Sequence, residues 1–111
     1  MGITTHVLDT ARGKPAAGVP VALEVRVQDG WQTVGRGMTD ADGRLRTLTD
    51  GHEVRNATYA ITFETDAYFT AQAQSGFYPV VRIEFRVTEA GAHHHVPLLL
   101  SPFGFSTYRG S

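Results

Sequence analysis

The sequence predicts an all-β protein, an antiparallel β-sandwich of about seven or eight short strands. Several stretches alternate apolar and polar residues with a period of two, which is typical of strands with one buried and one wet face. Glycine-containing turns separate these stretches at residues 29–31, 40–44 and 49–51. Because each strand must bury its apolar face, two sheets packed face to face are expected.

Five stretches of the sequence are predicted to form strands. Residues 4–10 form the first candidate, and residues 19–27 the second, where valine or leucine occupies every odd position. The same alternation returns in residues 58–64, through Tyr, Ile and Phe, and in residues 80–87. Residues 93–101, which join histidines to an apolar run, form the last clear strand before the aromatic ending.

Residues 65–76 break the alternation and predict one short helix. The segment begins with Thr65 and Asp66, either of which would serve as a helix cap. It ends on Ser-Gly, a helix-stop and turn signal. We therefore expect a helix over about residues 66–73.

Size and composition predict one globular domain over residues 1–111. The formal net charge is -1 with no basic stripe, which argues against a nucleic-acid partner. There is no cysteine, so disulfides and thiolate chemistry are excluded. We see no secretory signal and no membrane-spanning apolar run, and we expect a cytoplasmic protein.

The histidines are the first candidates for chemistry. By parity, His93 and His95 share one strand face, His94 takes the other, and His6 could meet His95 across one sheet surface. A positioned imidazole pair can take a proton from water and return it to a leaving group. Two alternatives stay open: single histidines on strands are often only structural, and His6, His93 and His95 would match a three-histidine zinc site.

Arg44 follows the turn of residues 40–43 directly, so its guanidinium emerges at a hairpin end. One interpretation is a surface arginine that pairs with Asp40 or Asp42 and contributes little. The other is a planar fork that binds an amide, urea or carboxylate and stabilises an oxyanion.

The ending is aromatic, with Phe103, Phe105 and Tyr108. We expect a buried aromatic strand that delivers the polar residues 108–111 to one point, where they would suit a small, planar, polar ligand. The alternative is a strand that only closes a sheet edge.

Four stretches, residues 5–23, 39–44, 66–79 and 93–111, resemble the 5-hydroxyisourate hydrolases, the enzyme branch of the transthyretin family. The Tyr-Arg-Gly-Ser ending is the specific part, because the resemblance implies that the hormone-carrier branch lacks it. It also implies eight strands in two sheets with one short helix. The expected assembly is a homotetramer, a dimer of dimers with active sites in the channel between dimers.

The resemblance further implies a cofactor-free hydrolase that converts 5-hydroxyisourate to 2-oxo-4-hydroxy-4-carboxy-5-ureidoimidazoline, in the degradation of urate to allantoin. By motif, His6, Arg44, His95 and Ser111 would be catalytic. All four would also bind the substrate, together with Tyr108, Arg109 and Gly110. The alternative function is a non-catalytic carrier of a small aromatic ligand, of the transthyretin type.

Two positions depart from the family pattern. His94 and Phe105 stand where the family usually has tyrosine. Because His94 faces away from His95 by parity, we expect altered packing or channel polarity rather than lost catalysis. The Phe105 change removes one hydroxyl.

Overall fold

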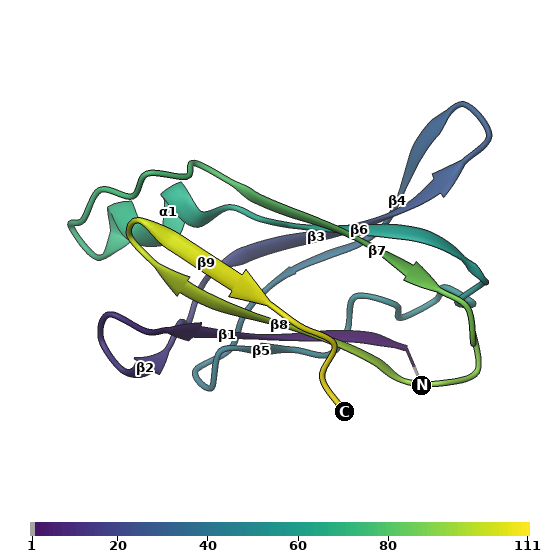
Figure 1. The fold of residues 1–111 in the computed structure, drawn as a ribbon, viewed down its shortest axis with the longest axis horizontal. Coiled ribbons are helices and arrows are strands. Elements are labelled where there is room, and N and C mark those ends of the chain that lie inside the picture. Colours follow the sequence, from purple (N-terminus) through teal and green to yellow (C-terminus); the bar gives the residue numbers. More distant parts are fainter. Residues whose placement is uncertain (1) are drawn as a thin grey trace.

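The computed structural model of this protein describes residues 2–111. Its strands form two sheets that lie one above the other, which confirms the predicted sandwich (Figure 1). Sheet A has the order β2-β1-β8-β9, and β5 also pairs with β1; sheet B has the order β4-β3-β6-β7. The strands of sheet A are β1 (Ile3–Asp9), β2 (Lys14–Pro15), β5 (Arg44–Leu45), β8 (His94–Ser101) and β9 (Gly104–Thr107). Those of sheet B are β3 (Pro20–Val27), β4 (Gly30–Met38), β6 (Ala57–Phe63) and β7 (Val81–Val87).

The strand pairs are antiparallel, as predicted, with one exception in sheet A. β1 and β8 run parallel, in a register that sets Thr4 opposite His95 and His6 opposite Pro97. Apolar alternation reports which face a residue occupies, but it does not report the direction of the neighbouring strand. The parallel pair brings two histidine-bearing segments, far apart in the sequence, into direct contact.

The core lies between the sheets and is built from the predicted strand faces. Burial alternates along the whole of β1 and along most of β3. The largest fully buried side chains are those of Tyr59, Tyr68, Phe63, Phe69, Ile3 and Leu23. Burying one such side chain contributes about 1.5–3 kcal/mol to the free energy of unfolding, relative to leaving it exposed. The core therefore holds the two sheets together.

The helix α1 (Thr65–Ala71) confirms the predicted helix to within one or two residues, and it lies at one end of the sandwich (Figure 1). The expected cap is wrong: Glu64 holds the N-cap position and makes no side-chain cap hydrogen bond. The Thr65 hydroxyl instead donates to the carbonyl oxygen of Tyr78, at 2.7 Å, and ties down the next segment. Within residues 2–111, no helix has the length and hydropathy needed to cross a membrane.

The final strand differs from the expectation of a buried aromatic strand. β9 pairs only with β8 and forms the edge of sheet A. Phe103, Phe105 and Tyr108 are 79%, 41% and 58% exposed. The expectation is therefore wrong for the single chain, because an edge strand has a partner on one side only. The alternative, a strand that closes the sheet edge, describes β9 correctly.

A buried carboxylate joins sheet A to the helix. The Asp9 side chain is fully buried, and its Oδ1 accepts the backbone N–H groups of Ala11 and Arg12. Its Oδ2 accepts the hydroxyl of Tyr68 at 2.7 Å. Burial, followed by this hydrogen bond, raises the pKa of Tyr68 above its ordinary value. Both carboxylate oxygens are thus satisfied without water.

We expect Tyr68→Phe to lower the free energy of unfolding by about 1–3 kcal/mol, because the variant leaves one buried oxygen of Asp9 without a donor. Urea denaturation followed by circular dichroism measures the change. Tyr108→Phe is the matched control, since it removes the hydroxyl of an exposed tyrosine. Equal stability of the two variants would contradict the proposed role of the Asp9–Tyr68 contact.

Candidate active site

The outward surface of sheet A carries the predicted histidines. Along β1, Thr4 and His6 are partly buried while Thr5 and Val7 point into the core. His95 lies opposite Thr4 on β8, and His6 is two residues further along β1. The structure therefore places His6 and His95 on one surface, as their parity predicts.

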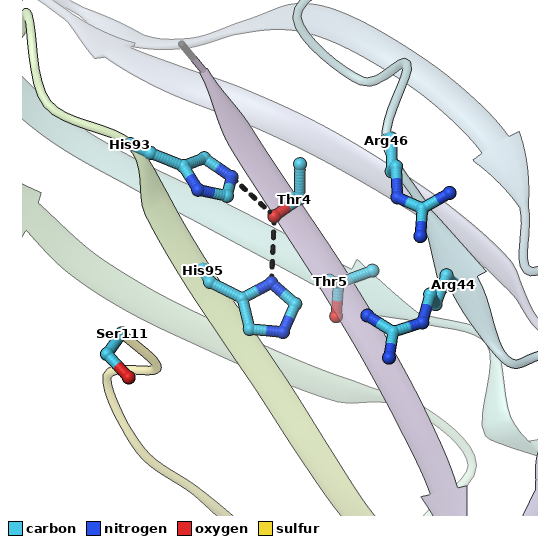
Figure 2. A pocket seen from close by; sticks show the side chains of 7 residues that line it. All are labelled: Thr4, Thr5, Arg44, Arg46, His93, His95 and Ser111. Atoms are coloured by element: carbon cyan, nitrogen blue, oxygen red, sulfur yellow. Dashed lines mark hydrogen bonds between the residues drawn. The ribbon is translucent and has the colours of Figure 1, made fainter.

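A hollow of about 250 Å³ opens on this surface (Figure 2). It is lined by Thr4, Thr5, Arg44, Arg46, His93, His95 and Ser111. Three of the residues predicted to be catalytic, Arg44, His95 and Ser111, thus share one cavity. The fourth, His6, does not line it but lies beside it, opposite Arg44 in the β1–β5 pairing.

The two outward histidines of the β8 segment meet at one hydroxyl. Thr4 Oγ1 lies 2.8 Å from Nε2 of His93 and 2.8 Å from Nδ1 of His95 (Figure 2). The two imidazole centroids are 6.2 Å apart. The hydroxyl therefore fixes the orientation of both rings at the mouth of the hollow.

Burial and neighbouring charges lower the pKa of His95 and so favour its neutral form. Burial is the largest cause that lowers the pKa of His95 from its ordinary value. Unfavourable charge interactions with His93, His6, Arg44 and Arg46 lower it further. A neutral imidazole at pH 7 has a free nitrogen lone pair and can act as a base.

Arg44 is not held by the acidic turn that precedes it. Asp40 Oδ1 accepts the backbone N–H groups of Asp42 and Arg44, both at 2.9 Å. The hydrogen bond from the Arg44 backbone is the largest cause that lowers the pKa of Asp40. The carboxylate is therefore used to close the turn, and the Arg44 side chain lines the hollow beside Arg46 (Figure 2).

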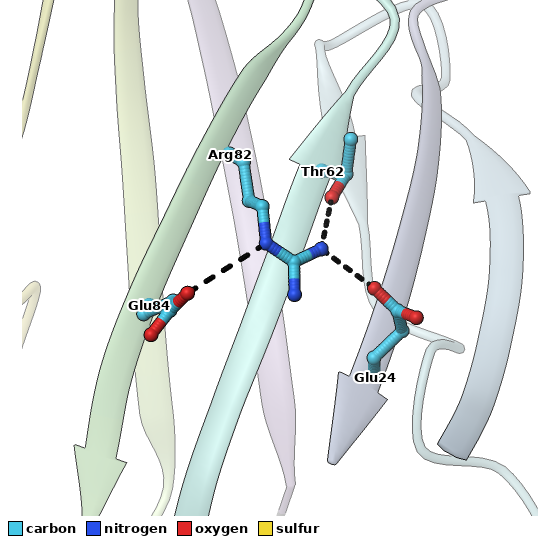
Figure 3. Close-up of polar contacts among 4 residues, drawn as sticks. All are labelled: Glu24, Thr62, Arg82 and Glu84. Carbon is cyan, nitrogen blue, oxygen red and sulfur yellow. Dashed lines mark hydrogen bonds and ion pairs between the residues drawn. The ribbon is translucent and has the colours of Figure 1, made fainter. Parts of the chain in front are cut away.

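Arg82 on sheet B, unlike Arg44, is paired with carboxylates. Its guanidinium contacts Glu24 at 2.7 Å and Glu84 at 3.8 Å, and it donates to Thr62 (Figure 3). Among residues 2–111, these two contacts are the ion pairs that the structure contains. Arg44 and Arg46 thus bring positive charge to the hollow without a carboxylate partner from the described chain.

The last residues of the chain line two different hollows. The backbone N–H of Gly110 donates to the carbonyl oxygen of His95 at 2.8 Å, and this bridge turns Ser111 into the hollow. A side chain at position 110 would collide with the His95 ring, because a Cβ would lie 2.6 Å from its Cδ2. Tyr108 and Arg109 line a second hollow, with Phe85 and Val96, so the structure does not bring all four residues to one point.

His94 occupies the position that parity predicts. It is buried, faces away from His95, and lies with its Nδ1 2.9 Å from the carbonyl oxygen of Ala92. The change from the family tyrosine therefore affects the interior side of β8 rather than the hollow. Phe105 lies on β9 and stacks edge-on against Tyr78, at a centroid distance of 5.3 Å.

The sequence had not indicated Thr4 or Arg46 as site residues, and it had indicated His93 only as a zinc ligand. A signal existed for each of them, since all three lie two residues from a predicted site residue on the same strand face. For the zinc alternative, the described residues 2–111 contain no cluster of three or more His, Asp or Glu side chains with the geometry to hold a metal ion.

Sequence comparisons identify the family and the relatives of this chain. Residues 3–110 match the model of the HIUase/Transthyretin family. A 5-hydroxyisourate hydrolase of Deinococcus radiodurans is 45% identical, with 99% of this chain and 96% of the relative covered. One from Salmonella dublin is 41% identical over 98% of this chain and 80% of the relative.

Solved structures of both branches of the family share the fold. The 5-hydroxyisourate hydrolase of Klebsiella pneumoniae superposes with a TM-score of 0.86 at 35% identity, covering 98% of each chain. Sea bream transthyretin, solved in complex with thyroxine, gives a TM-score of 0.91 at 31% identity, covering 97% of this chain and 93% of that one. On the extent of the family match and on these relatives, the chain belongs to the HIUase/Transthyretin family.

Proposed function

We propose that this protein hydrolyses 5-hydroxyisourate to 2-oxo-4-hydroxy-4-carboxy-5-ureidoimidazoline, a ring-opening hydrolysis of a cyclic amide in the breakdown of urate to allantoin. The observation that carries the proposal is the hollow on sheet A, where a neutral imidazole faces two guanidiniums and Ser111. Its closely similar relatives bear the name 5-hydroxyisourate hydrolase. A base beside positive charge is what amide hydrolysis requires.

In this mechanism His95 removes a proton from the attacking water, because its lowered pKa leaves the ring neutral. Arg44 binds the carbonyl oxygen and offsets the negative charge that develops on it in the tetrahedral intermediate. His6, opposite Arg44, orients the water or the substrate. Ser111 donates a hydrogen bond to substrate or water, while Tyr108, Arg109 and Gly110 anchor the end of the chain beside His95.

The carrier function is the rival, since the sea bream transthyretin complexed with thyroxine has the same fold. A carrier channel for an aromatic ligand favours an apolar lining. The hollow of this chain is lined instead by two arginines, two histidines, two threonines and a serine. This lining favours the hydrolase.

Freshly generated 5-hydroxyisourate, followed by its ultraviolet absorbance, tests the proposal. Catalytic amounts of protein are expected to accelerate the decay well beyond the buffer control, and protein treated with a chelator is expected to be equally active. A decay no faster than that in buffer would favour the carrier. Activity lost on chelation and restored by zinc would favour the metal hydrolase instead.

The pH dependence of kcat/KM tests the role of His95. The base must be neutral, and the pKa of His95 lies below its ordinary value, so protonation begins only at lower pH. We therefore expect full activity at pH 7 and an acid limb whose midpoint lies below about 6.5, the ordinary imidazole pKa. A midpoint above that value would contradict the assignment of His95 as the base.

The proposed assembly is a homotetramer, a dimer of dimers. Exposed aromatic side chains support it: Phe77 and Phe103 are 69% and 79% exposed, and Tyr78 bridges Phe77 and Phe105. A monomer rarely leaves so many aromatic rings in water. Light scattering is expected to give a mass four times the 12.1 kDa of one chain. Phe103→Glu is expected to lower this mass, and a wild-type protein that stays monomeric would contradict the proposal.

Two further proposals concern the domain organisation and the cellular location of the protein. We infer a single domain over residues 1–111, supported by one core cluster to which both sheets contribute. A cytoplasmic location stays a prediction, and cell fractionation tests it.

A further inference from the structure

Thr4 makes a contact that the hydrolysis described above does not use. Its hydroxyl is the shared partner of two imidazoles, at 2.8 Å from each (Figure 2). We infer that Thr4 relays a proton between His95 and His93, so that His95 acts first as the base and then as the acid of one turnover. This inference rests on the proposed hydrolase function and assigns a positioning residue to it.

A hydroxyl has one proton, and this couples the states of the two rings. When Thr4 donates to Nε2 of His93, it must accept from Nδ1 of His95. Nε2 of His95 then carries the lone pair, which suits a base. When Thr4 donates to Nδ1 of His95 instead, Nε2 of His95 carries the proton, which suits an acid. Figure 2 shows this second ring nitrogen directed away from Thr4.

The transfer balances without any added reactant. Nε2 of His95 takes a proton from the attacking water, and the ring becomes positively charged. The Nδ1 proton of His95 then passes to Thr4 Oγ1 as the proton of Thr4 passes to Nε2 of His93. His95 is now neutral with a proton on Nε2, ready for the leaving nitrogen. As that proton leaves, the reverse transfer from His93 through Thr4 returns a proton to Nδ1.

The surroundings favour a positive charge on His93 over one on His95. His93 is exposed to water, whereas His95 is partly buried. Burial first, and then charge interactions with His93, His6, Arg44 and Arg46, disfavour the charged form of His95 and lower its pKa. His93 also lines a third hollow, together with Arg46 and Asp50. The relay therefore moves charge from a poorly solvated ring to a better solvated one.

The position of Thr4 is fixed by the sheet. It is the second residue of the parallel β1–β8 register, directly opposite His95, and a β-branched side chain on a strand has few alternative rotamers. The neighbouring Thr5 shows that a hydroxyl on β1 does not contact these rings by default, because its Oγ1 donates to the carbonyl oxygen of Val96. The contact with both imidazoles is thus a property of position 4.

Thr4→Val and Thr4→Ser test the relay. Valine keeps the shape and removes the hydroxyl, and we expect kcat to fall by about tenfold or more, a part of the hundredfold or larger effect of a general acid–base group. Serine keeps the hydroxyl, and we expect activity within about threefold of wild type. Thr33→Val, an exposed threonine on β4, is the control. Thr4→Val with wild-type kcat, or Thr4→Ser as slow as Thr4→Val, would overturn the relay.

Two readouts separate a relay from mere packing. In mixtures of H2O and D2O, wild-type kcat should show a curved dependence on deuterium content, because more than one proton moves, and Thr4→Val should show a linear one. His93→Gln keeps a hydrogen-bonding group but does not accept the proton. Alone it should slow the reaction, and combined with Thr4→Val it should slow the reaction no further than Thr4→Val does. A linear wild-type dependence, or additive losses in the double variant, would overturn the relay while leaving the hydrolase function intact.

Discussion

Arg44→Ala is expected to reduce kcat by about a hundredfold or more, because it removes the donor that stabilises the developing oxyanion. In the structure the Arg44 side chain is in position for this role. Asp40 accepts hydrogen bonds from backbone N–H groups and does not pair with the Arg44 guanidinium. The β1–β5 pairing sets Arg44 opposite His6, and the Arg44 side chain lines the hollow. Arg46 lines the same hollow but lies two residues further along the chain.

The design of the Arg44 experiment separates charge from geometry. Arg44→Lys keeps the charge and loses the planar fork, and it is expected to recover only part of the lost rate. Arg36→Ala, an exposed arginine on β4 of sheet B, is the control and should match the wild type. Near-normal turnover in Arg44→Ala, with the fold intact by circular dichroism, would contradict the oxyanion role.

His95→Ala is expected to lower kcat by about a hundredfold or more, the loss that follows removal of a general base. His95 has contacts with several parts of the site: Thr4 contacts its ring and Gly110 contacts its backbone. Burial and then neighbouring charges lower its pKa. The variant is also expected to lose the acid limb of the pH profile that belongs to this ring.

Added imidazole provides the sharpest test of the His95 variant. Removal of the ring leaves space in the hollow, so free imidazole is expected to restore part of the activity of His95→Ala and none of that of Arg44→Ala. His52→Gln, which removes an imidazole that contacts Tyr59 away from the hollow, is the control. Wild-type activity in His95→Ala would exclude His95 as the base.

The fold was largely predictable because period-two alternation directly reflects burial. β1, β3, β6, β7 and β8 all lie within a residue or two of the predicted stretches, and so does the helix. Residue types were less informative about the end of the helix and about the edge of the sheet. Thr65 looked like a cap and instead binds Tyr78, and Phe105 looked like a core residue and instead lies on an edge strand. Both errors arise because a residue type does not reveal which long-range partner it will find.

The site was predictable in part. Parity placed His6, His93 and His95 on one surface and His94 on the other. The turn before Arg44 and the polar ending made Arg44 and Ser111 candidates, and the family resemblance gave both a catalytic role. Neither gave the distances between them. The separation of Tyr108 and Arg109 from Ser111 follows from the single backbone bridge between Gly110 and His95, which no sequence pattern encodes.

The sequence alone therefore determined the class of fold, the faces of the strands and the kinds of side chain that could do chemistry, since these depend on local periodicity and residue type. Only the tertiary structure decided that β1 runs parallel to β8, that Thr4 lies between two imidazoles, and that Arg44 has no carboxylate partner within residues 2–111. These features depend on strand register and on side chains about ninety positions apart in the chain, and such contacts are set by packing of the whole sheet rather than by any local stretch.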